Sequence, residues 1–337
     1  MELIISGYGM KPQNTLALYQ YEKDQTIQKQ WQTSIDNASF VCQADDYLYT
    51  VTEAEEYAIV YTFRQRGKEY EFIDQRKLDG GSLCHITYSA IHKALFGACY
   101  GTGTVFSIQV QEGKFGEVLF HEIQQGTDST ALTRAHCVVL NHQENEIIVV
   151  NIALDQIYFY EVKDGRLNLT QTLETPKGVG PRHVLLSRDE KYFYIITEYS
   201  NEILLYENNS EKSLLQRIST LSEDYSGISY CSTLCFSRNG EFLYAANRGA
   251  DTIALFTVGA KGELHRVEEY DCGGKHPRHM IVSEDGLFLV VCNQNSDNVA
   301  IFDLDVDHGF IKSRAASFEF AIPSGVLEIG DHNSSIF

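Results

Sequence analysis

Short apolar runs separated by polar turns recur along the whole chain. From His183 the sequence reads HVLLSRDEKYFYIITEYSNEILLYE, and from His279 it reads HMIVSEDGLFLVVCNQNSDNVAIFDL. Each segment holds three runs rich in Val, Ile, Leu, Tyr and Phe, and a fourth run such as SLLQRIST follows. Runs of this length bounded by turn residues predict β-strands, and four of them joined by tight turns predict an antiparallel meander.

The same pattern returns at a nearly constant spacing. Further copies begin at His85, His136 and Thr233, and a shorter copy begins at Val41. The copies start roughly 45 to 51 residues apart, so a chain of 337 residues holds about seven of them. This period predicts an all-β, seven-bladed β-propeller with four-stranded antiparallel blades, forming one domain over residues 1–337.

The missing parts of the seventh blade lie at the two chain ends. The amino-terminal region offers the runs LIISGYG, TLALYQYE and IQKQWQTSI, and the carboxyl-terminal region offers SGVLEI. We expect these three N-terminal strands and one C-terminal strand to form a single blade. Such a blade closes the ring and leaves no open sheet edge.

Composition and charge narrow the class of protein. No stretch approaches the roughly 20 apolar residues of a membrane span, and no basic segment precedes the first apolar run. Five of the eight cysteines, Cys42, Cys84, Cys137, Cys235 and Cys292, fall in predicted strands, which favours buried free thiols. We therefore expect a cytoplasmic protein. A net charge of -19 argues against nucleic acid or an anionic membrane as a partner.

Ionisable side chains gather where the strands of a hairpin begin and end. The beginning of a first strand lies beside the end of the second, so both points share one rim around the central channel. The predicted starts carry His85, His136, His183 and His279. The predicted ends carry Tyr100, Asn151, Glu198, Asn247 and Asn293. Arg182, Arg278 and Lys275 lie in the loops that enter first strands.

Repetition itself offers a structural explanation for some of these residues. A histidine that recurs in several blades can bond backbone groups between blades, and Asn at a strand end can serve the following turn. Glu198 and Arg248 instead depart from the repeat, and charges at a crowded mouth are costly unless they pair or bind something. Glu53 occupies a place equivalent to that of Glu198, so the glutamate alone is a weak signal.

Four segments, GVGPRH, YIITEYSNEILLYE, AANRGADTIALF and CGGKHPRHMIVSEDG, resemble a known family. It is the seven-bladed lactonase family, which contains the propeller-type 6-phosphogluconolactonases and the fungal 3-carboxymuconate lactonizing enzyme. The resemblance covers essentially the whole chain. It implies a catalytic cluster of His136, Arg182, Glu198 and Arg248, and we expect substrate contacts from His183, Asn247, His279, Arg278 and Asn293. The chain departs from the family pattern at Ser82-Leu83-Cys84-His85 and Thr133-Arg134-Ala135-His136, where many relatives have proline before histidine, and at Thr233.

The chemistry that these residues support is hydrolysis of an anionic sugar lactone. A general base, His136 or Glu198, activates water, and arginines hold the anion and the developing oxyanion. The expected substrate is 6-phospho-D-glucono-1,5-lactone, with no cofactor and no metal, because His276 and His279 lack a third ligand at suitable spacing. Two alternatives stay open: a lactonizing isomerase acting on a muconate-like diacid, and a non-enzymatic propeller that binds a protein or a metabolite.

Overall fold

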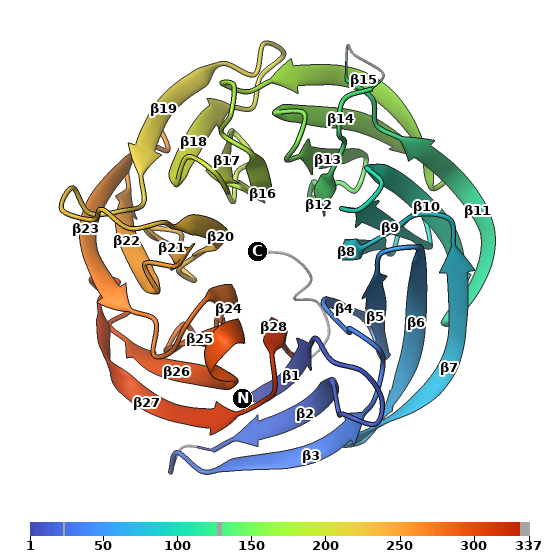
Figure 1. Ribbon diagram of the computed structural model, residues 1–337, viewed down its shortest axis with the longest axis horizontal. Helices are drawn as coiled ribbons and strands as arrows, with labels where there is room; N and C mark the ends of the chain where they lie inside the picture. The colour runs from blue at the N-terminus through green and yellow to red at the C-terminus, as the bar shows by residue number, and fades with distance from the viewer. Residues whose placement is uncertain (23, 127–129, 331–337) are drawn as a thin grey trace.

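The blades surround a central channel in a computed structural model that describes residues 1–22, 24–126 and 130–330 (Figure 1). Within these ranges 28 strands form seven four-stranded antiparallel sheets. The predicted all-β, seven-bladed propeller is therefore confirmed. Across the described parts of the chain, helices of membrane-spanning length and hydrophobicity are absent.

Each blade runs from the channel outward in chain order, with the first strand innermost. Blade 1 comprises β4 (Val41–Ala44), β5 (Tyr47–Ala54), β6 (Tyr57–Arg66) and β7 (Glu69–Leu78). Blade 2 comprises β8 (Leu83–Ser89), β9 (Ala94–Cys99), β10 (Thr104–Gln111) and β11 (Lys114–Ile123). Blade 3 comprises β12 (Ala135–Leu140), β13 (Glu146–Asn151), β14 (Gln156–Lys163) and β15 (Arg166–Glu174).

The other half of the ring repeats this arrangement. Blade 4 comprises β16 (Pro181–Leu186), β17 (Tyr192–Thr197), β18 (Glu202–Glu207) and β19 (Leu214–Ser219). Blade 5 comprises β20 (Tyr230–Phe236), β21 (Phe242–Arg248), β22 (Thr252–Val258) and β23 (Leu264–Asp271). Blade 6 comprises β24 (Pro277–Val282), β25 (Phe288–Asn293), β26 (Asn298–Leu304) and β27 (Ile311–Glu319), with a short 3-10 turn over Gln294–Ser296.

Blade 7 joins the two ends of the chain. Its strands are β28 (Pro323–Glu328), β1 (Glu2–Gly7), β2 (Leu16–Tyr21) and β3 (Ile27–Thr33), in that order from the channel outward. β28 pairs antiparallel with β1, and Leu3 lies opposite Glu328. This confirms the predicted closure by three N-terminal strands and one C-terminal strand.

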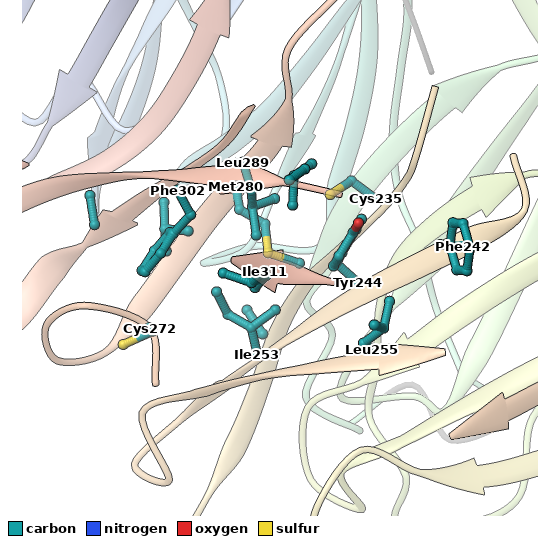
Figure 2. Packing of buried hydrophobic residues seen from close by; sticks show 14 residues of the cluster. Cys235, Phe242, Tyr244, Ile253, Leu255, Cys272, Met280, Leu289, Phe302 and Ile311 are labelled. Carbon is teal, nitrogen blue, oxygen red and sulfur yellow. The ribbon is translucent and has the colours of Figure 1, made fainter. Parts of the chain in front are cut away.

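The inner strands are apolar along their length because both faces of each blade are covered by neighbouring blades. β13 and β17 are buried at every position after the first, whereas the outermost strand β15 is largely exposed. Seven hydrophobic clusters fill the seven interfaces between adjacent blades. Figure 2 shows the cluster between blades 5 and 6, where Met280 and Leu289 pack near Tyr244 and Ile253. The free energy of folding thus comes mainly from contacts between blades.

The predicted free thiols are also observed. All eight cysteines are unpaired, and seven of them are buried. Burial raises the pKa of the Cys84 and Cys137 thiols, so these side chains act as small apolar groups in the core.

Candidate active site

Two recurring backbone positions supply the side chains at one mouth of the channel. In β8, β12, β16 and β24 the pairing register shifts between the first and third residues, so the second residue bulges. Bulges of this kind redirect a side chain. We call this second residue the bulge position; it is occupied by Cys84, His136, Arg182 and Arg278.

The second position follows the paired end of the second strand in each blade. Its N–H donates to the carbonyl just before the innermost strand, as in Glu198 to Gly180. We call it the strand-end position; blades 7, 1, 2, 3, 4 and 6 place there Tyr8, Glu53, Tyr100, Ile152, Glu198 and Gln294. In blade 5, Arg248 stands at the same level and pairs with Tyr230.

This register corrects the predicted alignment of the copies by one residue in two places. His136 was aligned with the recurring histidines, but it occupies the bulge position together with Arg182 and Arg278. Glu198 was aligned with Asn247 and the other strand-end asparagines, but it stands one residue beyond them. Glu198 and Arg248 are therefore equivalent residues of neighbouring blades, which is why their side chains meet.

Glu198 lies between two buried arginines. Its Oε2 atom is 3.0 Å from Nε of Arg182 and 3.0 Å from Nη2 of Arg248. Arg182 also donates from Nη1 to the Ser232 carbonyl and to Nε2 of His183, and Arg248 donates to the carbonyls of Tyr230 and Cys231. Arg182 is 2% exposed and Arg248 is 7% exposed. Three of the four predicted catalytic residues thus form one network.

Electrostatics keep this network ionised. Burial alone would raise the pKa of Glu198, but the positive charges of Arg182 and Arg248 outweigh burial and hold the pKa below its usual value of 4.5. Burial and the neighbouring guanidinium groups lower the pKa of Arg182 and of Arg248, yet arginine remains protonated near neutral pH. Among the described residues, Oε1 of Glu198 accepts no hydrogen bond.

A second charged group borders the first. Arg278 donates from Nη2 to the Tyr8 hydroxyl at 2.6 Å, and that hydroxyl donates to Oε2 of Glu53 at 2.8 Å. Burial opposes the charge on Arg278, but Tyr8 and Glu53 outweigh it and raise its pKa. The sequence reasoning did not identify Tyr8. It belongs to the split blade, and its strand-end position would have been the signal.

His136, the fourth predicted catalytic residue, lies beside this network as a neutral ring. Its centroid is 5.2 Å from His183 and 5.9 Å from Tyr100. Burial, then the charges of Arg182 and Arg278, lower its pKa well below 6.5. Its Nδ1 atom is buried and has no hydrogen-bond partner within the described structure.

This mouth therefore has the composition that the family resemblance implied. A model described as "Lactonase, 7-bladed beta-propeller" matches residues 2–327. The chain belongs to this family. A 6-phosphogluconolactonase of Bacillus subtilis is 29% identical over 272 residues, covering 78% of each chain. One from Klebsiella pneumoniae is 24% identical over 288 residues, covering 84% of each.

Solved structures of this fold superpose closely on the chain. A Pseudomonas aeruginosa structure described as a periplasmic gluconolactonase gives a TM-score of 0.89 at 24% identity, covering 97% of this chain and 98% of that one. A Lactobacillus plantarum protein gives a TM-score of 0.88 at 22% identity, covering 97% and 99%. At these identities the superpositions establish the shared fold.

Rings close the channel below the lactonase-family cluster. We use the term ring pack for the side chains of Phe40, His85, His136, His183 and His279. His85 lies 4.2 Å from Phe40 and 5.6 Å from His183, centroid to centroid. Nδ1 of His279 accepts a hydrogen bond from Val326 N–H at 3.2 Å, and Nδ1 of His85 accepts one from Val138. His85 and His279 therefore tie the inner strand of one blade to that of the next.

Two predicted substrate-binding asparagines occupy structural places. Asn247 and Asn293 are 0% exposed. The Asn247 amide donates to the Thr220 carbonyl, and the Asn293 amide donates to the Cys272 carbonyl. Because no part of either side chain reaches the surface of the mouth, the prediction of substrate contacts is not supported for them. His183 and His279 lie in the ring pack, and Arg278 lies in the charged network.

A cavity of about 600 Å³ lies on the other side of the ring pack. It is lined by apolar inner-strand residues such as Leu185 and Ile281, and by His85, His183 and His279 at its inner end. The lining does not include Arg182, Glu198 or Arg248. The charged cluster is thus a shallow site on the opposite mouth. In the ranges that the structure describes, no group of three His, Cys, Asp or Glu side chains is placed to hold a metal ion.

Proposed function

We propose that this protein hydrolyses an anionic sugar lactone, with 6-phospho-D-glucono-1,5-lactone as substrate. The observation that carries the proposal is the ionised Glu198 held by Arg182 and Arg248 at the channel mouth. Family membership and the names of the curated relatives support the reaction class and the substrate.

Charge supports an anionic ligand. The mouth carries four arginines, Arg134, Arg182, Arg248 and Arg278, against two glutamates, Glu53 and Glu198. Its neighbouring histidines have pKa values lowered by burial and are neutral. This mouth is therefore positive on a chain whose net charge is -19. Such a site attracts an anion and places positive charge where a carbonyl oxygen becomes an oxyanion.

The residues divide the reaction as follows. Glu198 Oε1 takes a proton from water, and the water oxygen attacks the lactone carbonyl. The tetrahedral oxyanion is stabilised by Arg278, whose described side-chain hydrogen bonding is limited to Tyr8. Collapse of the intermediate breaks the ring ester bond, and the leaving alkoxide takes the proton from Glu198. His136, a neutral acceptor, orients the same water.

Arg182 and Arg248 act mainly on Glu198. Most of their N–H groups bond Glu198 and backbone carbonyls, so they keep the carboxylate ionised and fix its direction. An isolated carboxylate at this depth would tend to be protonated.

The test is turnover of the phosphorylated lactone, corrected for spontaneous hydrolysis. Glu198→Gln keeps the shape of the side chain and removes the base, and we expect kcat to fall about a hundredfold or more. Glu319→Gln, on the exposed face of β27, is the matched control and should behave as the wild type. Wild-type kcat in a correctly folded Glu198→Gln variant would refute the proposed site.

A further inference from the structure

The four arginines of the mouth differ in how far their N–H groups are committed. Arg182 and Arg248 bond Glu198 and backbone carbonyls, and Arg278 belongs to the chain that ends at Glu53. Arg134 makes one side-chain hydrogen bond, from Nη1 to the Tyr100 hydroxyl at 2.7 Å. Its Nε and Nη2 groups contact no acceptor within the described residues.

Arg134 is nevertheless held in a defined place. It is the residue before β12, where its N–H donates to the Asn151 side chain and its carbonyl accepts from Ile152. Its guanidinium carbon lies 4.7 Å from the centroid of the Tyr100 ring, a cation–π contact. Two contacts to one rigid ring restrict the guanidinium group and so lower the entropy cost of binding a ligand there.

Tyr100 connects Arg134 to the proposed reaction centre. Its ring meets that of His136 edge-on at 5.9 Å. Burial raises the pKa of Tyr100, Arg134 opposes the rise, and Glu198 adds to it, so the phenol lies within electrostatic reach of both. Arg134 is therefore one aromatic ring away from His136, at the edge of the site.

The residue type at this place is particular to blade 3. Before the innermost strand, blades 2, 4 and 6 carry Ser82, Gly180 and His276. The neutral or weakly basic groups of these blades cannot provide a permanent charge, whereas Arg134 can bind a phosphate through two parallel N–H groups.

We propose that Arg134, positioned by Tyr100, forms a distal anion subsite that selects lactones with a phosphate group remote from the reacting carbonyl. This inference rests on the proposed lactonase function and assigns its substrate preference to one residue. The buried arginines serve the carboxylate base and the oxyanion, and Arg134 serves the substituent at the other end of the substrate.

The experiment compares two substrates in the full-length chain. For the wild type, Arg134→Ala, Arg134→Lys and Tyr100→Phe, kcat/KM is measured on 6-phosphogluconolactone and on unphosphorylated glucono-1,5-lactone. The ratio of the two values should fall roughly tenfold to a hundredfold in Arg134→Ala, the loss expected for one charged hydrogen-bonding group. Arg134→Lys and Tyr100→Phe should fall less. Arg314→Ala, exposed on β27, is the charge-matched control.

Each outcome decides something. A ratio in Arg134→Ala equal to that of the wild type, whether through no loss or through equal loss on both substrates, overturns the subsite. If the wild type hydrolyses neither lactone, the proposed function fails, and calorimetric binding of 6-phosphogluconate against gluconate then tests the subsite separately. A preference for the phosphorylated acid that survives in Arg134→Ala would overturn it there too.

Discussion

At the scale of single residues, the decisive feature is a buried carboxylate with two buried guanidinium groups. Moving such charges out of water is costly, and mutual attraction with additional hydrogen bonds offsets that cost. The Arg182, Glu198 and Arg248 group meets this requirement with ion-pair distances of 3.0 Å and several bonds to backbone carbonyls. A network of this kind is weak evidence for added stability, and its position at a mouth favours a role in binding or catalysis.

The pH dependence of turnover follows from the direction of the two pKa shifts. Glu198 has a pKa held below 4.5, and His136 has a pKa well below 6.5, so both are in their basic forms above about pH 5. We expect kcat/KM to be flat from about pH 5.5 to 8 and to fall only as pH drops towards the lowered pKa of Glu198. The measurement is a pH profile corrected for spontaneous hydrolysis. An acidic limb centred near pH 6.5 would contradict it and indicate a histidine with an ordinary pKa.

Sequence reasoning found most of the charged residues of the site but misplaced two of them in the repeat. Arg182, Glu198, Arg248 and Arg278 were identified because they depart from neighbouring copies or follow a repeated proline. His136 was assigned to the wrong repeat position because a histidine in one copy was matched to a histidine in the next. A bulge shifts pairing by one residue without changing the apolar pattern, so the letters alone did not reveal it.

At the scale of elements, the bulge in the innermost strands and the end of the second strand are the two devices that build the site. They place side chains from blades 1, 2, 3, 4, 5, 6 and 7 at one mouth while the remaining strand residues stay in register. The apolar runs predicted every strand class, including the fourth strand SLLQRIST, observed as β19. Register could not be predicted, because both faces of an inner strand are buried and alternation is lost.

Gly7 tests the element that supports Tyr8. A Cβ atom there would lie 2.7 Å from the Ile322 carbonyl oxygen and 2.8 Å from the Phe320 ring, too close for either to remain in place. Gly7→Ala should lower the free energy of unfolding by about 1–3 kcal/mol, the usual effect of overpacking. It should also lower kcat/KM, because Tyr8 and its contact with Arg278 shift. Urea denaturation and lactone turnover measure the two effects.

The control for Gly7 is a glycine with free space around it. Gly67 lies in a hairpin turn with a φ of 65° and no atom within 4 Å of the Cβ position. Gly67→Asn tolerates this left-handed conformation and should keep wild-type stability. Equal stability of Gly7→Ala and the wild type would contradict the tight packing at the junction of the two chain ends.

At the scale of the whole molecule, the ring is held by seven similar interfaces and one junction made from both chain ends. The repeat period predicted the blade number, and the leftover runs predicted the closing blade, because both depend only on apolar patterning and length. The positive mouth was less visible from the sequence. It forms from single residues of blades that lie far apart in the chain.

Removing the closing strand tests the junction. A chain that stops after Ile322 lacks β28, so the edge of β1 is unpaired and the hydrophobic surfaces beside blade 7 are exposed. We expect aggregation or loss of cooperative unfolding, measured by size-exclusion chromatography and thermal denaturation. A chain that stops after Gly330 keeps every described strand and serves as the control. A soluble, cooperative protein without β28 would show that closure is dispensable.

The ring pack gives the propeller a direction. Because aromatic and imidazole rings fill the axis below the charged residues, a molecule bound above them cannot pass through to the cavity beneath. The entrance used by an incoming lactone is then also the doorway through which the sugar acid departs. An acid that lingers there blocks the next lactone, so accumulating product slows its own formation by competing for the same opening.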